Sequence, residues 1–249
     1  MKDKIEQMPI LFSKADIISY FSNEFQYRNW LYSRLKNNRI QKIRNDLYAL
    51  VDISTGFPYA NKFQIASQIT KTSFVAYHSA LEYYGLANQA TLDCIVGTTT
   101  KFREFNFQDI EFSCLLFKDS FDVLNKYTED IKVTSLEKTV IDCIDNINLG
   151  GGIDEILNAL SFILYLNENK LIVALEHYDK IVLYQKVGFI LEHFNDRLKL
   201  SEDFFNFCKS KLTNQIKYFL TDDFYKNSFN AKWQLVAPTN LLSRIYGGL

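Results

Sequence analysis

The spacing of apolar residues changes at Asn38, and this change constrains the fold more than any other feature of the chain. From about residue 24 to residue 37 apolar residues recur every four positions, which predicts a helix whose buried face is formed by Tyr27, Leu31 and Leu35. After Asn38, "IQKIR" and "LYALV" are typical of β-strands. Asn tolerates the left-handed backbone of a helix end, so we expect the helix to stop at Asn38.

A short helix is expected before this one. Ser13 can cap residues 14–21, and Ser22-Asn23 then breaks the helix. Asn45-Asp46 suits a tight turn between the two strands. Helix, turn, helix and hairpin together predict a winged helix-turn-helix, in which the second helix enters the major groove of DNA and the hairpin touches the neighbouring backbone. The alternative is that these elements serve only packing or dimerisation.

The same segment is basic. Residues 28–45 contain six Lys or Arg and no Asp or Glu, although the whole chain of 249 residues has 28 basic and 29 acidic residues. A local basic surface on an otherwise acidic protein is typical of binding to DNA or RNA, because phosphate contacts release counterions. A solvated helix face would show the same charges.

Counting 100° per residue divides the polar side chains of this segment into two roles. Side chains that point away from Leu31 are candidates for reading base edges: Gln26, Asn29, Ser33 and Lys36. Basic residues beside the buried stripe or in the hairpin are candidates for holding phosphates: Arg28, Arg34, Arg39, Lys42 and Arg44. We expect Lys42 and Arg44 on the outer edge of the hairpin.

The expected fold class is α+β, with the winged helix-turn-helix in residues 1–55 and a mixed α/β regulatory domain with a mainly helical C-terminal part in residues 56–249. The joint is "DISTGFP", where Gly56 permits a turn and Pro58 can open the next helix. "LDCIV", "FREFNF" and "IEFSCLLF" read as strands, with turns at residues 97–100 and at Gln108-Asp109. From Ile153 onward the chain is mainly helical in character, and Ser201 is expected to cap one of these helices.

Two later motifs carry polar residues that could be functional, and the first of them contains a histidine. In "SFVAYHSALEYYGL", residues 73–86, Gly85 should close a helix, and His78 has no partner at a recognisable spacing, which favours a structural or surface histidine. The Gly-rich "NLGGGIDEIL" lacks the Lys-Ser/Thr pair of a Walker loop, so we expect a flexible joint rather than a phosphate site.

The second motif is "IKVTSLEKTVIDCIDN", residues 131–146. Thr134 and Glu137 predict a capping box at the start of a helix. Lys138 and Asp142 are then one helical turn apart, which predicts an exposed ion pair rather than a catalytic dyad.

Several function classes are disfavoured. Cys94, Cys114, Cys143 and Cys208 form no CxxC pair, so we expect buried thiols in a reducing cytoplasm and no metal or cofactor. Met1 to Glu6 is charged and the apolar runs are short, which predicts neither a secretion signal nor a membrane span. The chain is not expected to be an enzyme. A metal-dependent nuclease using Asp93 and Glu111 is the weakest alternative, because no third carboxylate follows at a suitable spacing.

"LYSRLKNNRIQKIRNDLYALVD" resembles the winged-helix end of the AbiEi family, the antitoxins of type IV toxin-antitoxin and abortive-infection systems. The family's recurrent Leu, Ile and Tyr positions are occupied here by Leu31, Leu35, Ile40, Ile43 and Tyr48. The segments 73–86 and 131–146 are similar to the later motifs of the family. The resemblance covers roughly residues 10–147.

The resemblance implies an autorepressing DNA-binding protein. It would bind double-stranded operator DNA, at inverted repeats upstream of its own operon, for which a homodimer on DNA would be suited. It would also neutralise a nucleotidyltransferase-like toxin without a stable complex. The alternative from a different class is a protein-interaction module, in which residues 57–249 bind a partner and the basic segment is incidental.

Overall fold

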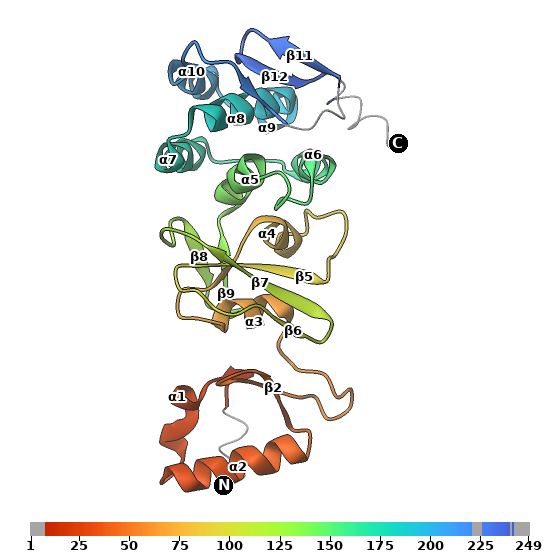
Figure 1. The fold of residues 1–249 in the computed structure, drawn as a ribbon, viewed down its shortest axis with the longest axis vertical. Helices are drawn as coiled ribbons and strands as arrows, with labels where there is room; N and C mark the ends of the chain where they lie inside the picture. Colours follow the sequence, from red (N-terminus) through yellow and green to blue (C-terminus); the bar gives the residue numbers. More distant parts are fainter. Residues whose placement is uncertain (1–7, 221–225, 240, 242–249) are drawn as a thin grey trace. The chain divides into compact units, whose positions relative to one another are not determined.

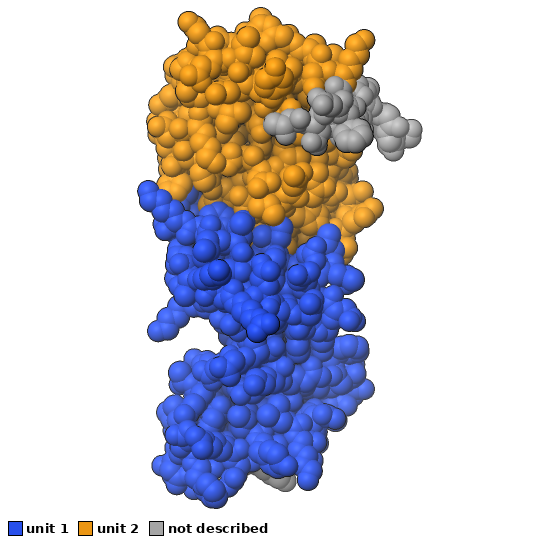
Figure 2. All heavy atoms as spheres, viewed as in Figure 1, with its two compact units in different colours: residues 1–75, 91–133 blue, residues 76–90, 134–249 orange. Residues whose placement is uncertain are grey.

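The computed structural model describes residues 8–220, 226–239 and 241, and it has a mixed α/β fold, as the sequence predicts (Figure 1). The chain divides into two compact units (Figure 2). Unit 1 comprises residues 1–75 and 91–133, and unit 2 comprises residues 76–90 and 134–249. The domain boundary expected between residues 55 and 56 lies inside unit 1, so it stays a prediction.

Unit 1 begins with the segment that the sequence analysis singled out. Its elements are β1 (Leu11–Phe12), α1 (Lys14–Ile17), the 3-10 helix η1 (Ile18–Tyr20), α2 (Glu24–Lys36), β2 (Ile40–Arg44) and β3 (Leu47–Leu50). The three strands form an antiparallel sheet in the order β1-β3-β2. The predicted helix and strand pair are confirmed, whereas the two-residue strand β1 was not expected.

Short polar side chains fix the ends of these helices. The Asp16 carboxylate accepts a hydrogen bond from the backbone N–H of Ser13 at 2.7 Å, and Asn23 caps α2 by accepting from the backbone N–H of Gln26 at 2.9 Å. Asn38 has a φ of 51°, which confirms the expected left-handed end after α2. In the hairpin turn, Asp46 takes the positive φ of 56°.

Aromatic packing joins α2 to the small sheet. The core cluster consists of Met8, Phe12, Ile17, Tyr27, Ile40 and Tyr48. The rings of Phe12 and Tyr48 stack with centroids 5.7 Å apart. Trp30 tilts against Phe12 and Phe21, with ring centroids 6.1 Å and 5.3 Å apart. The buried face of α2 therefore includes Trp30 as well as the predicted residues.

The rest of unit 1 is built around a six-stranded sheet with the order β6-β7-β5-β4-β9-β8. Its elements are α3 (Lys62–Gln68), β4 (Phe74–Val75), β5 (Asp93–Thr98), β6 (Phe105–Phe107), β7 (Ile110–Leu116), β8 (Val123–Lys126) and β9 (Ile131–Thr134). The three predicted strands are confirmed as β5, β6 and β7. Gln108 and Asp109 turn between β6 and β7 with φ values of 50° and 61°, as this dipeptide predicted.

Two local expectations in unit 1 are wrong. Gly97 and Thr98 belong to β5, so the expected turn at residues 97–100 is shorter. Pro58 does not open a helix. It forms an isolated bridge with Val51, and α3 begins only after Asn61, whose side chain accepts from the backbone N–H groups of the first turn.

Unit 2 is mainly helical, as expected from Ile153 onward. Its elements are α4 (Tyr77–Tyr83), α5 (Leu136–Asp145), α6 (Ile153–Phe162), α7 (Glu168–Tyr178), α8 (Ile181–His193), α9 (Asn195–Leu198), α10 (Glu202–Ser210), β10 (Lys217–Tyr218), β11 (Asn227–Asn230) and β12 (Leu235–Pro238). Gly85 ends α4 with a φ of 70°, and Ser201 caps α10, as predicted. The sheet β10-β12-β11 was missed, because its strands are short and partly polar.

The start of α5 differs from the expected capping box. Ser135 is the N-cap, and its Oγ accepts from the backbone N–H of Lys138 at 3.1 Å. Thr134 instead shares a hydrogen bond of 2.7 Å with the hydroxyl of Thr139, and Glu137 accepts from the backbone N–H of Asn167 at 2.9 Å. Both polar side chains bind groups that the sequence pattern could not place.

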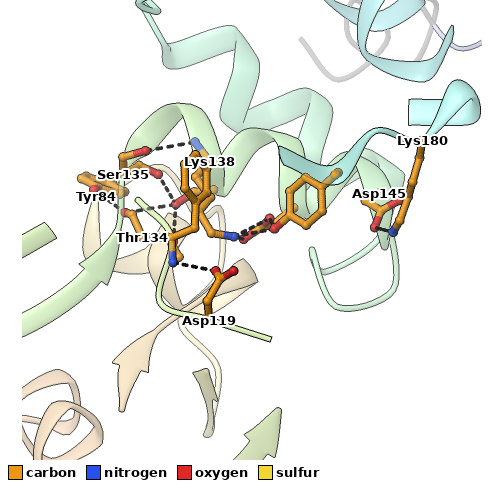
Figure 3. Close-up of polar contacts among 11 residues, drawn as sticks. Tyr84, Asp119, Thr134, Ser135, Lys138, Asp145 and Lys180 are labelled. Atoms are coloured by element: carbon orange, nitrogen blue, oxygen red, sulfur yellow. Dashed lines mark hydrogen bonds and ion pairs between the residues drawn. The ribbon is translucent and has the colours of Figure 1, made fainter. Parts of the chain in front are cut away.

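Lys138 and Asp142 form a buried ion pair, so the expectation of an exposed pair is wrong. Their side chains are 2% and 0% exposed, and Nζ of Lys138 lies 2.9 Å and 2.7 Å from the two carboxylate oxygens of Asp142 (Figure 3). Nζ of Lys138 also donates a hydrogen bond of 2.5 Å to the Tyr178 hydroxyl, and that hydroxyl donates to Asp142. Burial raises the pKa of Tyr178, so the phenol keeps its proton and serves as a donor.

The buried pair gives a stability prediction. Asp142→Asn removes the carboxylate that pairs with the buried Lys138 ammonium at 2.7 Å, so the free energy of unfolding should fall by about 3 to 5 kcal/mol. Urea unfolding followed by Trp233 fluorescence in a Trp30→Phe background measures the free energy of unfolding of unit 2. The matched control is Glu176→Gln, which removes a partly exposed pair with Lys211 at 3.5 Å and should cost less than about 1 kcal/mol. Equal losses would contradict the assigned burial.

Gly188 in α8 gives a prediction about whether an added methyl group raises or lowers the stability of the protein. A Cβ at this position would lie 2.2 Å from Cζ3 of the buried Trp233. Gly→Ala inside a helix usually stabilises by about 1 kcal/mol. Here overpacking against the indole should outweigh that gain, and Gly188→Ala should destabilise by about 1 to 3 kcal/mol. Thermal unfolding measures whether stability falls or rises. The control is Asn169→Ala at an exposed position of α7, which should be neutral or mildly stabilising. A rise in stability for Gly188→Ala would refute this packing.

Candidate nucleic-acid interface

The base-reading candidates lie on the outward face of α2. Asn29, Ser33 and Lys36 are exposed, and their side chains have no hydrogen-bond or ion-pair partner within the described residues. Gln26 is also exposed, but its Oε1 accepts a hydrogen bond of 3.3 Å from the backbone N–H of Ser22. Three of the four side chains are therefore available to a ligand without breaking a contact.

Two aromatic side chains share this outward face and were missed by the sequence analysis. Phe25 is 71% exposed and Tyr32 is 68% exposed. They stand seven residues apart, so the helical period places them on the same side of α2. The spacing from Phe25 to Tyr32 was visible in the sequence, but it could not show that Trp30, rather than these two residues, faces the core.

The carboxylates of this part of unit 1 are all engaged locally. Residues 8–55 contain four acidic residues. Their hydrogen-bond donors are Ser13 for Asp16, Lys14 and Arg28 for Glu24, the backbone N–H of Lys14 for Asp46, and Ser54 for Asp52. Hydrogen bonds from Lys14 and Arg28 also lower the pKa of Glu24. These acids hold turns and helix starts together.

The phosphate-binding candidates fall into two groups. Arg28 is exposed but bound to Glu24, with Nη2 at 2.8 Å from the carboxylate. Three other candidates, Arg34, Arg39 and Lys42, have no ion-pair partner within the described part of the chain, and the base-reading candidate Lys36 has none there either. Arg34 is half-buried and the other three are exposed. They surround the turn from α2 into the edge strand β2, so this region carries uncompensated positive charge.

Arg44 is placed differently from Lys42, although both lie on β2. A register shift separates the two residues in the β2–β3 pairing. Arg44 is half-buried, and its guanidinium carbon lies 5.4 Å from the ring centroids of both Phe102 and Phe105. Only Lys42 has the free, exposed position expected for both. The two rings come from far along the chain, so sequence reasoning had no signal for this packing.

Other polar candidates have structural partners. His78 is buried, and its Nε2 lies 3.1 Å from Oε1 of Glu155, which also accepts from the backbone N–H of Asn88 at 2.7 Å. The partner that the sequence analysis did not find is thus in the first turn of α6. Gly151 of the Gly-rich loop packs on this histidine, because a Cβ there would lie 2.6 Å from Cδ2 of His78.

The carboxylates of the nuclease alternative do lie side by side. Asp93 and Glu111 face each other in the parallel register of β5 and β7, and both are exposed. No group of three or more His, Cys, Asp or Glu side chains that could hold a metal ion occurs within the described residues. None of the four cysteines forms a disulfide, and three of them are buried.

Comparison with known proteins shows a shared fold. No family model matches the sequence, and no curated protein matches it. The crystal structure of the RV2827C protein from Mycobacterium tuberculosis is similar, with a TM-score of 0.66 over 99% of this chain and 92% of that chain. The two sequences are 9% identical, so the likeness concerns the fold alone. Within the described residues, no helix is both long and apolar enough to cross a bilayer.

The contrast between Arg44 and Lys42 can be tested by stability. Arg44→Ala removes two cation–π contacts and should lower the free energy of unfolding of unit 1 by about 1 to 2 kcal/mol. Lys42→Ala on the same strand should change it by less than about 0.5 kcal/mol. Urea unfolding followed by Trp30 fluorescence in a Trp233→Phe background measures both. Equal effects would show that Arg44 is not anchored on the two rings.

Proposed function

We propose that this chain is a sequence-specific, double-stranded DNA-binding transcriptional regulator. The observation that carries the proposal is the charge arrangement around α2. Every carboxylate of residues 8–55 is held in a local hydrogen bond, whereas Arg34, Lys36, Arg39 and Lys42 have no ion-pair partner within the described residues. Unpaired cations beside an exposed polar helix face suit a polyanion whose phosphates flank a groove.

The geometry also supports a winged helix-turn-helix. Only Phe21, Ser22 and Asn23 separate η1 from α2, and helix-turn-helix motifs use turns of three or four residues. In this proposal α2 is the recognition helix and the β2–β3 hairpin is the wing. The wing's Lys42 lies on the edge strand, where its ammonium group can reach a phosphate.

The mechanism is operator occupancy. The outward face of α2 enters the major groove, where Asn29, Ser33 and Lys36 read base edges, with Gln26 at the entry. Arg28, Arg34, Arg39 and Lys42 hold the flanking phosphates and set the register. Arg44 contributes mainly by anchoring the wing to Phe102 and Phe105. A protein bound in this way blocks transcription from the DNA that it covers.

The AbiEi resemblance extends the proposal to an autorepressing antitoxin of a type IV toxin-antitoxin system in the cytoplasm. Its operator would be inverted repeats upstream of its own operon, bound by a homodimer with half-sites about one helical turn apart. The operon would also encode a nucleotidyltransferase-like toxin, which the chain would counteract without a stable complex. The gene next to this one tests the toxin part directly.

A protein-interaction module is the second candidate. The sequence analysis placed it in residues 57–249, whereas the exposed apolar side chains of Phe25 and Tyr32 favour the outward face of α2. DNase footprinting on the DNA upstream of the chain's own reading frame separates the two. Protection of a defined segment supports the regulator, and uniform absence of protection at low salt would favour the interaction module.

Salt dependence tests the phosphate contacts. With Arg28, Arg34, Arg39 and Lys42 on phosphates, the logarithm of affinity should fall with the logarithm of salt concentration with a slope of about −4. Lys42→Ala should reduce the magnitude of the slope by about 1 and weaken binding to all DNA sequences alike. Asn29→Ala should instead reduce the preference for one sequence over others. The control is Lys170→Ala, an exposed lysine of unit 2 that should leave the slope unchanged. A wild-type slope near zero would refute the interface.

A further inference from the structure

The outward face of α2 is an ordered row of four side chains. Phe25, Asn29, Tyr32 and Lys36 follow one another at steps of four, three and four residues. At 100° per residue they fall within an arc of about 60°. The opposite side of the helix carries Tyr27 and Trp30, which pack on the core of unit 1. The row is therefore held outward by the packing behind it.

The two aromatic residues of the row have no role within unit 1. With 71% and 68% of their surfaces exposed, Phe25 and Tyr32 leave most of their ring area in water. Two rings on one face of a helix form an apolar surface that a ligand can cover favourably. In the major groove of DNA the apolar group at the base edge is the C5-methyl group of thymine.

We propose that α2 reads A·T base pairs, with Asn29 bound to adenine and Phe25 or Tyr32 packed on thymine methyl groups. This inference rests on the proposed DNA-binding function and specifies its sequence class. Asn pairs with adenine through two hydrogen bonds to N6 and N7, and both hydrogen-bonding groups of Asn29 are free of partners within the described residues.

The spacing along the helix suits this assignment. With a rise of about 1.5 Å per residue, Phe25 lies about 6 Å and Tyr32 about 4.5 Å from Asn29 along the axis. Successive base pairs are about 3.4 Å apart. Each ring therefore lies about one to two base pairs from the adenine that Asn29 contacts, and a short run of A·T pairs can satisfy all three side chains.

The charges favour DNA over a second copy of the chain as the occupant of this face. Lys36 lies on this face, Arg39 and Lys42 follow it in the turn and on β2 without ion-pair partners in the described part of the chain, and Glu24 is already bound by Lys14 and Arg28. A self-complementary contact would bring these cations near their own copies. In the major groove they meet the phosphates on either side.

The test removes only the methyl group. The duplex upstream of the reading frame is amplified once with dTTP and once with dUTP, which keeps base pairing and replaces each thymine methyl by hydrogen. The full-length chain is titrated with both duplexes at fixed salt. Because burying one methyl group is worth about a fourfold change in affinity, the wild type should bind the thymine duplex at least about fourfold more tightly.

The variant Phe25→Ala/Tyr32→Ala should bind both duplexes equally, since it lacks the rings that contact the methyl groups. Comparing the ratio between wild type and variant cancels any effect of uracil on the shape of the DNA. The control is Tyr127→Ala, which removes another highly exposed aromatic residue of unit 1 and should keep the wild-type ratio.

The outcomes separate the inference from the function on which it rests. Equal wild-type affinity for both duplexes overturns thymine reading while DNA binding stands. A thymine preference of unchanged size in the double variant also overturns it, because the two rings then contribute nothing to the preference. Absence of salt-dependent binding to either duplex refutes the proposed function itself.

Discussion

The packing of Trp30 determines which face of α2 is exposed to solvent. Its indole lies against Phe12 and Phe21, and Tyr27 packs beside it in the same cluster. A helix has only one rotation that buries both residues, and that rotation turns Asn29, Tyr32 and Lys36 outward. The arrangement of the candidate interface thus follows from hydrophobic burial on the other side of the helix.

Charge and packing are coupled in this segment. The acidic side chains of residues 8–55 serve as caps, turn acceptors and ion-pair partners, so they are not free to neutralise the cations near β2. Arg44 shows the opposite use of a cation, because its guanidinium packs against two phenylalanine rings. Basic residues in one short stretch of sequence therefore have different roles, because some remain exposed and unpaired whereas others are bound or packed within the fold.

In unit 2, burial gives polar residues of two sequence motifs roles that their spacing alone did not predict. The spacing of Lys138 and Asp142 is that of an ordinary surface pair, yet α7 covers the pair and Tyr178 completes its hydrogen bonds. The same applies to His78, whose partner Glu155 lies in another helix. Both groups are nearly excluded from solvent, which favours roles in holding the helices of unit 2 in one arrangement.

The sequence by itself determined the local elements of this protein. Apolar spacing, the cap at Ser201, the left-handed Asn38 and the Gln108-Asp109 turn depend on neighbours a few residues away, so they could be predicted together with the exposed polar face of α2. Tertiary structure alone decided the rest: the anchoring of Arg44, the burial of Lys138 and the outward placement of Phe25. The physical reason is that these outcomes depend on contacts between segments distant in the chain, and burial by such contacts sets the energetic role of a charge or a ring.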